Sequence, residues 1–287
     1  MAAPIERIVD AHIHLWDPAN AEWYPYLAGQ RELDMGDISG MCRLFDQSTY
    51  FAESSNWNVV KFVHVAAATA PHSGAETAHL QQLAEATGHP DAIIGGIVPQ
   101  DPIVETERLL DQQMQSPRFR GIRPMGGAMG VPGAEVLRAL ADRDLIFELM
   151  AHPDVLESAA ATLADFDGLT IVVEHAGWPR SDEPEERALW ERGITALAGV
   201  GENVHCKLSG LAMPLHSNEA AVLRPWIEHC LEQFGVDRCM FASNFPVDAM
   251  HGTYDELYGA YDGATADLDA ETRDKLFAAN AERLYRC

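Results

Sequence analysis

Positively charged residues are scarce in this sequence. Lys and Arg together number 20 against 44 Asp and Glu, for a formal net charge of -24 at pH 7. Lysine occurs only at Lys61, Lys207 and Lys275, and every other basic residue is an arginine. A surface this acidic repels phosphate backbones and anionic lipid headgroups, which excludes nucleic acids and membrane surfaces as partners. The sequence therefore predicts a protein whose partner is a small-molecule substrate.

Long apolar runs and paired cysteine motifs are also lacking. No segment of the sequence approaches the roughly 20 apolar residues of a membrane-spanning helix. Residues 1–7 are too short for a secretory signal before the first predicted strand. The 5 cysteines are odd in number and none has Cys-x-x-Cys spacing, which favours free thiols in a reducing compartment. We therefore expect a cytoplasmic protein.

Short apolar, β-branched runs alternate with Ala-, Leu- and Glu-rich stretches along the chain. The runs predict eight strands, at 7–13, 59–65, 93–98, 121–125, 145–150, 169–174, 204–208 and 239–243. The stretches predict helices at 45–56, 75–87, 102–115, 133–142, 154–164, 184–199, 219–234 and 269–285. Eight strand–helix units predict a single-domain (β/α)8 TIM barrel of the α/β class over residues 1–287. The alternative, a doubly wound sheet, lacks a Gly-rich phosphate loop after the first strand.

The first predicted strand ends in Asp10-Ala11-His12-Ile13-His14. Side chains on a strand alternate between two faces, so Asp10, His12 and His14 are expected to share one face. Two imidazoles side by side on a rigid strand can chelate a divalent cation or hold a reacting carbonyl. The alternative is one hydrogen-bonded core histidine and one exposed histidine.

Polar residues recur where the other predicted strands end. In a TIM barrel the chemistry gathers at the carboxyl ends of the strands, so these residues are expected at one mouth. They are His64, Arg120, Arg123, Glu148, His152, Glu174, His175, Lys207, Ser209, Asn244 and Asp248. Alternation predicts that Glu174 faces away from His175. No Gly-x-Ser-x-Gly elbow surrounds Ser209, so a serine nucleophile is not expected.

Three motifs together resemble the amidohydrolase superfamily: His12-Ile13-His14, Glu174-His175-Ala176-Gly177-Trp178-Pro179 and Phe241-Ala242-Ser243-Asn244-Phe245-Pro246-Val247. With the segment Phe119-Arg120-Gly121-Ile122-Arg123, they are similar to its amidohydrolase 2 branch. That branch includes lactonases acting on pyrone dicarboxylate, sulfomuconolactone and sugar lactones. The resemblance extends from Ile8 to Tyr285.

The resemblance implies a hydrolase of small esters or lactones. His12, His14 and His175 would hold either a divalent metal, zinc or manganese, or the substrate carbonyl, since some members of the branch use zinc and others work without metal. An acid after the eighth strand would activate water. This sequence departs from the pattern there, because Asn244 stands where an aspartate is usual and an amide cannot accept a proton near neutral pH.

Three interpretations of Asn244 remain open: a natural variant that orients water or substrate, an engineered change, or a loss of hydrolysis. We favour the natural variant, with Asp248 as the nearest alternative base. The alternative for Asp248 is a cap on the helix that follows. The predicted catalytic residues are His12, His14, His175, Asn244 and Asp248.

The predicted substrate-binding residues are Arg123, Arg120, His64, His152, Trp16 and Trp178. An arginine can bind a substrate carboxylate with two hydrogen bonds. Alternatively, Arg120 and Arg123 could each form a salt bridge with one of the many acidic residues, and this structural role is favoured for Arg120. For His64 a place in the core behind the site is favoured. The two tryptophans either wall the site or pack on helices, and the irregular segment 15–44 is either a lid or a cover over the barrel edge.

Three functions compete at this point: a hydrolase of carboxylate-bearing lactones, a metal-dependent decarboxylase of the same superfamily, and a non-catalytic binding barrel. The lactone hydrolase is favoured, because the decarboxylase would normally keep the acid after the eighth strand. Asn244 alone favours the binding barrel. The sequence identifies no interface, although many such barrels form homo-oligomers.

Overall fold

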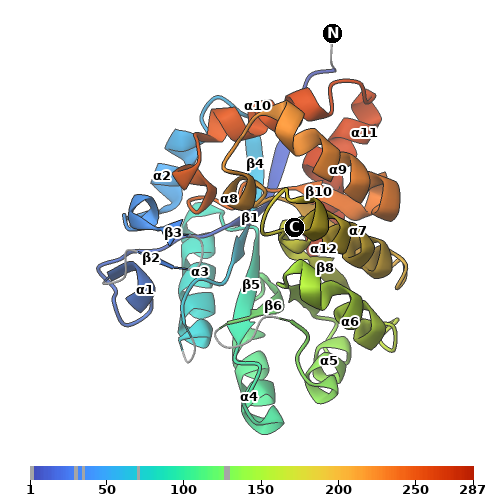
Figure 1. Cartoon of the computed structure of the whole chain (residues 1–287). Helices are drawn as coiled ribbons and strands as arrows, with labels where there is room; N and C mark the ends of the chain where they lie inside the picture. Colours follow the sequence, from blue (N-terminus) through green and yellow to red (C-terminus); the bar gives the residue numbers. More distant parts are fainter. Residues whose placement is uncertain (1–2, 29–31, 34–35, 70–71, 126–129) are drawn as a thin grey trace.

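The apolar, β-branched segments form eight parallel strands arranged as a nearly closed barrel, with helices around them (Figure 1). The computed structural model describes residues 3–28, 32–33, 36–69, 72–125 and 130–287. The strands follow one another in chain order: β1 (Ile8–Ile13), β4 (Val59–Val65), β5 (Ala92–Ile97), β6 (Phe119–Pro124), β7 (Ile146–Leu149), β8 (Ile171–Val173), β9 (Val204–Leu208) and β10 (Cys239–Phe241). The predicted (β/α)8 barrel is confirmed, and the doubly wound sheet was the wrong alternative.

The first strand, β1, pairs with the segment that follows the last strand, β10, and this pairing joins the two ends of the barrel. Ile13 forms a parallel bridge with Phe245. The His14 N–H donates to the Phe245 carbonyl at 2.8 Å, and the Asn244 N–H donates to the His12 carbonyl at 2.8 Å. The two segments that carry the predicted catalytic residues are therefore joined through their backbones.

Amphipathic helices cover the outside of the barrel. Seven of them lie within a few residues of the predicted ranges: α2 (Gln47–Glu53), α3 (Ser73–Thr87), α4 (Ile103–Gln113), α5 (Ala134–Ala141), α6 (Pro153–Leu163), α7 (Pro184–Ala198) and α9 (Ala220–Phe234). Proline occupies the first position of α6 and of α7, where its missing N–H costs nothing. The C-terminal helix predicted at 269–285 consists of α11 (Ala270–Asp274), a π-helical turn (Lys275–Ala279) and α12 (Asn280–Tyr285).

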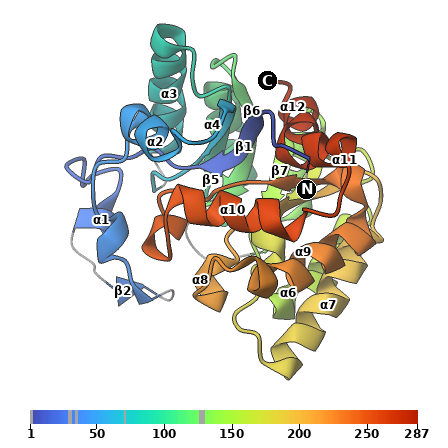
Figure 2. The same ribbon diagram turned by 90° about the horizontal axis from the view of Figure 1, so that it is seen from above.

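The sequence patterns missed several smaller elements and one full helix, α10 (Tyr254–Ala264). The Thr253 side chain caps this helix by accepting the Glu256 N–H, and the Glu256 carboxylate accepts the Thr253 N–H. This reciprocal pair is a capping box. The short elements are α1 (Pro25–Ala28), β2 (Glu32–Leu33), β3 (Gly36–Asp37) and α8 (Ala212–Leu215). Figures 1 and 2 place α1 and β2 at one edge of the molecule, on the side opposite α7.

One extra residue in β1 changes the direction of its side chains. From Asp10 to Ile13 the strand advances three residues, while its partner β4 advances two, from Phe62 to His64. Ala11 packs with the inner-barrel residues and His12 also faces inward, so Asp10 lies on the outer face. The expectation that Asp10 shares a face with the two histidines was therefore wrong, because a bulge interrupts the alternation.

Asp10 instead ties the barrel to two helices. Its carboxylate accepts hydrogen bonds from the hydroxyls of Tyr50 on α2 (2.8 Å) and Tyr254 on α10 (3.1 Å). It also accepts the Ser243 N–H at 2.8 Å. All four residues are buried, and burial raises the pKa of Asp10. The carboxylate thus joins the two ends of the strand ring to the helical layer.

The C-terminal helix closes the barrel at the end away from the carboxyl ends of the strands. Helix α12 packs against β1 and β10, and Tyr285 is completely buried. Arg120 on β6 donates to the carbonyls of Tyr285 (2.7 Å) and Arg286 (3.3 Å). The prediction that Arg120 binds substrate was wrong, because its guanidinium holds the last residues of the chain at the opposite end of the barrel.

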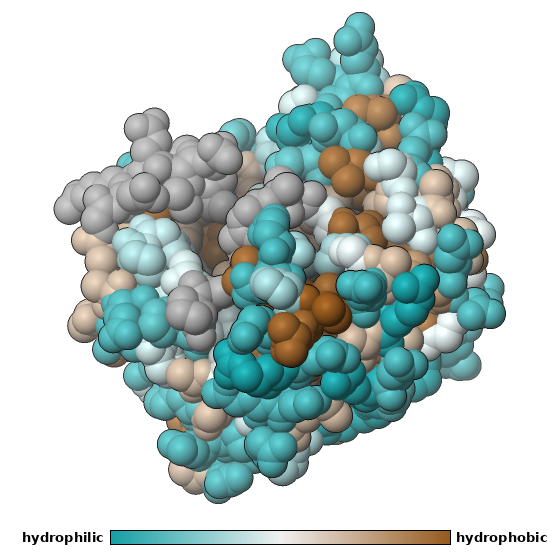
Figure 3. All heavy atoms as spheres, turned by 90° about the horizontal axis from the view of Figure 1, so that it is seen from below, coloured by the Kyte–Doolittle hydropathy of each residue, from teal (hydrophilic) through white to brown (hydrophobic). Residues whose placement is uncertain are grey.

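The surface seen in Figure 3 is mainly hydrophilic, with apolar residues in small groups. Large apolar side chains that are exposed among the described residues include Leu44, Val104 and Met114. Within the part of the chain that the structure describes, no helix has the length and hydrophobicity needed to cross a bilayer.

The position of Asp10 generates a stability prediction. Replacing Asp10 by Ala removes the acceptor of two buried hydroxyls and of two buried N–H groups, those of Ser243 and His12, so we expect the free energy of unfolding to fall by about 3 kcal/mol. Urea denaturation followed by circular dichroism measures this change. As a control, Glu202→Ala removes a carboxylate whose side chain is 94% exposed and should change stability by less than about 0.5 kcal/mol. Equal effects of the two substitutions would contradict the structural role of Asp10.

Candidate active site

Three imidazoles from distant parts of the chain converge inside the barrel at the carboxyl ends of its strands. The ring centroid of His12 lies 4.8 Å from that of His14 and 4.7 Å from that of His175. The three side chains are at most 3% exposed. The convergence predicted from the sequence is confirmed by these distances.

Hydrogen bonds fix two of these rings. Nδ1 of His14 lies 2.8 Å from the Val65 carbonyl, which can only accept, so Nδ1 carries the hydrogen and Nε2 has a free lone pair. Nδ1 of His175 lies 3.0 Å from the Ser209 hydroxyl. Ser209 thus orients a histidine, in agreement with the expectation that it is not a nucleophile.

The left-handed backbone after β8 places His175. His175 and Ala176 have φ values of 52° and 51°, which are costly for residues with a Cβ. Gly210 makes room for the ring, because a Cβ added there would lie 2.6 Å from Cγ of His175. The φ of Gly210 is +63°, in the region that favours glycine.

Burial keeps the three imidazoles neutral. It lowers the pKa of His175 to about 3, with Arg123 and Lys207 adding to the effect. It also lowers the pKa values of His12 and His14 far below the ordinary value for histidine. Each ring therefore carries one lone pair and one N–H at neutral pH, and the N–H of His14 is already donated to the Val65 carbonyl.

Asp248 carries a buried carboxylate oxygen without a hydrogen-bond partner. Its Oδ1 accepts a hydrogen bond from Nδ2 of Asn244 at 3.1 Å, while Oδ2 has no hydrogen-bond partner. Burial raises the pKa of Asp248 to about 7, although hydrogen bonds from Asn244 and from the Gly210 backbone oppose the shift. Asp248 does not cap the following helix, because Thr253 does so. Asn244 therefore positions a carboxyl group that can exchange a proton near neutral pH.

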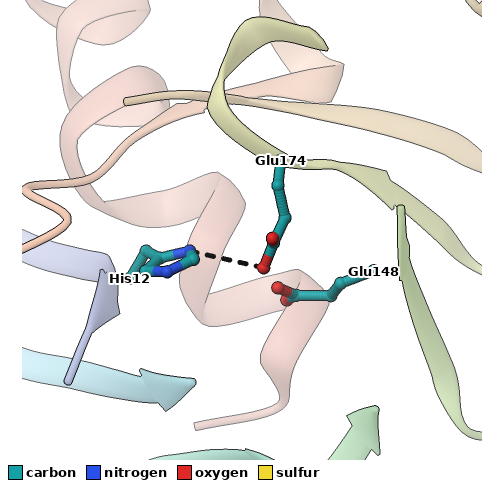
Figure 4. A group of neighbouring side chains, drawn as sticks. All are labelled: His12, Glu148 and Glu174. Carbon is teal, nitrogen blue, oxygen red and sulfur yellow. Dashed lines mark ion pairs between the residues drawn. The ribbon is translucent and has the colours of Figure 1, made fainter. Parts of the chain in front are cut away.

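Two buried glutamates and a lysine lie behind His12. Figure 4 shows the side chains of His12, Glu148 and Glu174 directed toward one another. Oε1 of Glu174 lies 3.6 Å from Nδ1 of His12, and Nζ of Lys207 lies 2.6 and 2.8 Å from the two oxygens of Glu148. The expectation that Glu174 faces away from His175 was wrong, because β8 ends at Val173 and the turn that follows sends both side chains inward.

Arg123 lies at the edge of the histidine cluster. Its Nη2 donates to the Ala66 carbonyl at 2.6 Å, and its Nη1 is 3.5 Å from Oε2 of Glu174. Its buried Nε–H has no hydrogen-bond partner. The guanidinium therefore retains N–H groups that could bind an anionic ligand.

Aromatic rings extend from the cluster on two sides. Trp178 lies 5.8 Å from His175 and 4.9 Å from His152, measured between ring centroids. Trp16 stacks on His14 at 5.7 Å, with 9° between the planes. The structure thus brings Trp16, Trp178 and His152 next to the site, as expected for walls.

A separate cavity of about 780 Å³ lies outside the barrel, between segment 15–24, α2 and α3. Its walls are largely aromatic and aliphatic, and Trp16 is one of them. Among the described residues, neither Lys nor Arg lines it. Residues 29–31 and 34–35 of segment 15–44 lie outside the described residues, so the choice between a lid and a cover stays open.

His64 is fully buried and faces the helical layer. Its Nδ1 accepts the Leu15 N–H at 3.2 Å, and its Nε2 is 3.7 Å from Oε1 of Glu76 on α3. The prediction of a substrate-binding role for His64 was wrong, because alternation along β4 turns its neighbours Val63 and Val65 inward instead. The favoured alternative, a histidine behind the site, agrees with the structure.

The donor set of the histidine cluster suits a divalent cation. Nε2 of His12 and Nε2 of His14 are 3.2 Å apart, and such a separation requires a proton or a cation between the two nitrogens. Two imidazole nitrogens on a tetrahedral zinc ion are about 3.3 Å apart, given zinc–nitrogen distances of about 2.0–2.1 Å. A second candidate set, His12, Glu148 and Glu174, offers ligand atoms within 4.8 Å of one another.

Comparison with known proteins identifies the family. A family model described as amidohydrolase matches residues 9–287, so the chain belongs to the amidohydrolase family. An uncharacterized protein of Sinorhizobium fredii, y4mH, is 33% identical, with 97% of this chain and 98% of the relative covered. An L-fucono-1,5-lactonase of Burkholderia ambifaria is 26% identical, with 97% and 95% covered.

Solved structures share the fold. An amidohydrolase from Burkholderia multivorans with bound zinc has a TM-score of 0.81 and 23% identity, with 97% of this chain and 99% of that chain covered. A 5-carboxyvanillate decarboxylase from Sphingomonas paucimobilis has a TM-score of 0.67 and 15% identity, with 98% and 99% covered. The fold therefore occurs in proteins named for hydrolysis and in proteins named for decarboxylation.

The contact between Gly210 and His175 generates a second prediction. Gly210→Ala combines a left-handed backbone with a steric clash, so we expect the free energy of unfolding to fall by about 1–3 kcal/mol. Gly259→Ala is the matched control, since nothing lies within 4 Å of a Cβ at that helical position. It should leave stability unchanged or raise it by up to about 1 kcal/mol. If Gly210→Ala is as stable as the control, the close packing against His175 is wrong.

Proposed function

We propose that this amidohydrolase-family protein hydrolyses a small lactone or ester that carries a carboxylate. The observation that supports this most directly is the convergence of three neutral imidazoles, joined through Asn244 to Asp248, a buried carboxyl whose pKa is about 7. Asn244 bonds to the His12 carbonyl through its backbone N–H and to Asp248 through its side chain, and Oδ2 of Asp248 has no hydrogen-bond partner. The relative named as a lactonase, similar over nearly its whole length, supports the same substrate class.

Each residue has a distinct role in this proposal. Deprotonated Asp248 takes a proton from water as the oxygen attacks the ester carbonyl carbon, and Asn244 orients the carboxylate through its Nδ2–H. The carbonyl becomes an oxyanion, the bond to the alkoxide oxygen breaks, and protonated Asp248 returns the proton to that oxygen. An N–H of His12 or His175 stabilises the oxyanion, because the N–H of His14 is bonded to the Val65 carbonyl, and Arg123 holds the substrate carboxylate.

The histidine cluster would also be the place for a metal. His12, His14 and His175 would hold zinc or manganese, which as a Lewis acid would polarise the carbonyl oxygen. The zinc-bound relative and the 3.2 Å separation of the two Nε2 atoms support this assignment. A metal-free site with the same residues in the same roles remains the alternative. Cytoplasmic location and homo-oligomer formation stay predictions.

Asp248 determines the expected pH dependence. Only the deprotonated form is a base, so kcat/KM on an active lactone should rise with pH through about 7 and level off above it. Asp248→Asn should lower kcat/KM by about 10²–10⁴-fold and remove this pH dependence. The control Asp267→Asn, at a side chain that is 69% exposed, should leave both unchanged. The measurement is titration of acid release from a panel of small lactones, with and without added Zn²⁺ or Mn²⁺.

The same panel separates the competing functions. Release of CO₂ from carboxylate substrates without lactone opening would favour the decarboxylase. Ligand binding with no turnover, unchanged in Asn244→Asp, would favour the non-catalytic barrel. An absence of turnover across the panel under all metal conditions would count against the lactonase.

Arg123 generates a separate prediction on specificity. Arg123→Met should raise KM for carboxylate-bearing lactones by about 10–100-fold, because a charge-assisted hydrogen bond contributes about 1.5–3 kcal/mol. Turnover of a neutral lactone of similar size should change little. Arg108→Met, at a side chain that is 68% exposed, is the control. A similar loss on both classes of substrate would show that Arg123 maintains the site without recognising the carboxylate.

A further inference from the structure

A completely buried group of charged residues lies beneath the histidine cluster, and the proposed hydrolysis assigns it no role. Glu148 on β7, Glu174 after β8 and Lys207 on β9 are each 0% exposed. Unpaired charges in such a place would cost several kcal/mol each, so the group must be nearly neutral as a whole. Lys207 and Arg123 supply two positive charges for the two glutamates.

Lys207 places its ammonium group between Glu148 and His12. Nζ lies 2.6 and 2.8 Å from the two oxygens of Glu148 and 3.4 Å from Nδ1 of His12. Glu148 and His12 are two of the three residues, with Glu174, whose ligand atoms lie within 4.8 Å of one another. The composition of that set, one imidazole and two carboxylates, is typical of a zinc or manganese site.

The C-terminal helix holds the ammonium in place from the other side. The Tyr285 hydroxyl donates to Oε1 of Glu148 at 2.7 Å, and Nζ of Lys207 lies 5.3 Å from the centroid of the Tyr285 ring, over its face. A carboxylate, an aromatic face and an imidazole thus surround the ammonium. A divalent ion within about 3 Å of this charge would be strongly repelled.

We infer that Lys207 is a resident cation that occupies the His12–Glu148–Glu174 set in place of a divalent metal. Its charge compensates the carboxylates and excludes metal from the Nδ1 side of His12. Any metal that the protein binds is thereby restricted to the Nε2 side, where His14 and His175 lie. This inference concerns metal binding and does not depend on the proposed hydrolysis.

Removing the ammonium tests the inference. Lys207→Met keeps the length of the side chain and leaves the two carboxylates without their cation. After equilibrium dialysis against Co²⁺, elemental analysis should find one more equivalent of cobalt per chain than in the unchanged protein, with new visible absorption bands. The control Glu148→Gln/Lys207→Met lacks one ligand and should show no gain. Circular dichroism confirms that both variants are folded.

Two results would overturn the inference. One is a folded Lys207→Met variant that binds no additional cobalt. The other is a cobalt ion beside Glu148 in the unchanged protein, seen by anomalous diffraction from crystals soaked in Co²⁺. The diffraction experiment requires no substitution, so it decides the question even where Lys207→Met does not fold. Neither measurement involves lactone turnover, so failure of the proposed function would leave this test unaffected.

Discussion

The single extra residue in β1 is the constraint on which the site depends. By taking three residues from Asp10 to Ile13 where β4 takes two, the strand turns both His12 and His14 inward and leaves Asp10 on the outer face. Without the bulge, the two-residue period would keep Asp10 beside the histidines and bury a carboxylate next to them. Because of the bulge, the two histidines point into the candidate site, while the Asp10 carboxylate accepts hydrogen bonds from Tyr50 and Tyr254 and so connects their helices to the barrel.

The same strand also joins the two ends of the barrel. Backbone hydrogen bonds connect His12 and His14 to Asn244 and Phe245, so these proposed site residues at the two ends of the strand ring form one hydrogen-bonded unit. Asn244 adopts a left-handed φ of 56° at this junction. That turn directs its amide toward Asp248, whose burial brings the carboxyl pKa close to neutrality. Geometry and protonation are therefore determined by the same backbone contact.

Few positively charged side chains balance the buried carboxylates beneath the histidine cluster. The chain has an excess of acids overall, yet the barrel interior pairs Glu148 and Glu174 with Lys207 and Arg123. Lys207 is one of only three lysines in the sequence. The helix that carries Tyr285 completes this arrangement from the far end of the barrel, so the C-terminal residues support the site without reaching the mouth. Tyr285 and Glu148 are 137 positions apart in the sequence, and no local pattern marks their association.

The sequence by itself determined the barrel, the strand ranges and the convergence of His12, His14 and His175, because periodicity and strand ends are local properties of the chain. It did not determine the orientation of Asp10, Glu174 and His64 or the place of Arg120. Those depend on a bulge, on a left-handed turn after β8, on which strand face a helix covers, and on where the C-terminal helix docks. The turn after β8 is local, but the closely packed space that it needs beside Gly210, like the other three features, involves segments distant in the sequence, so tertiary packing decides these orientations.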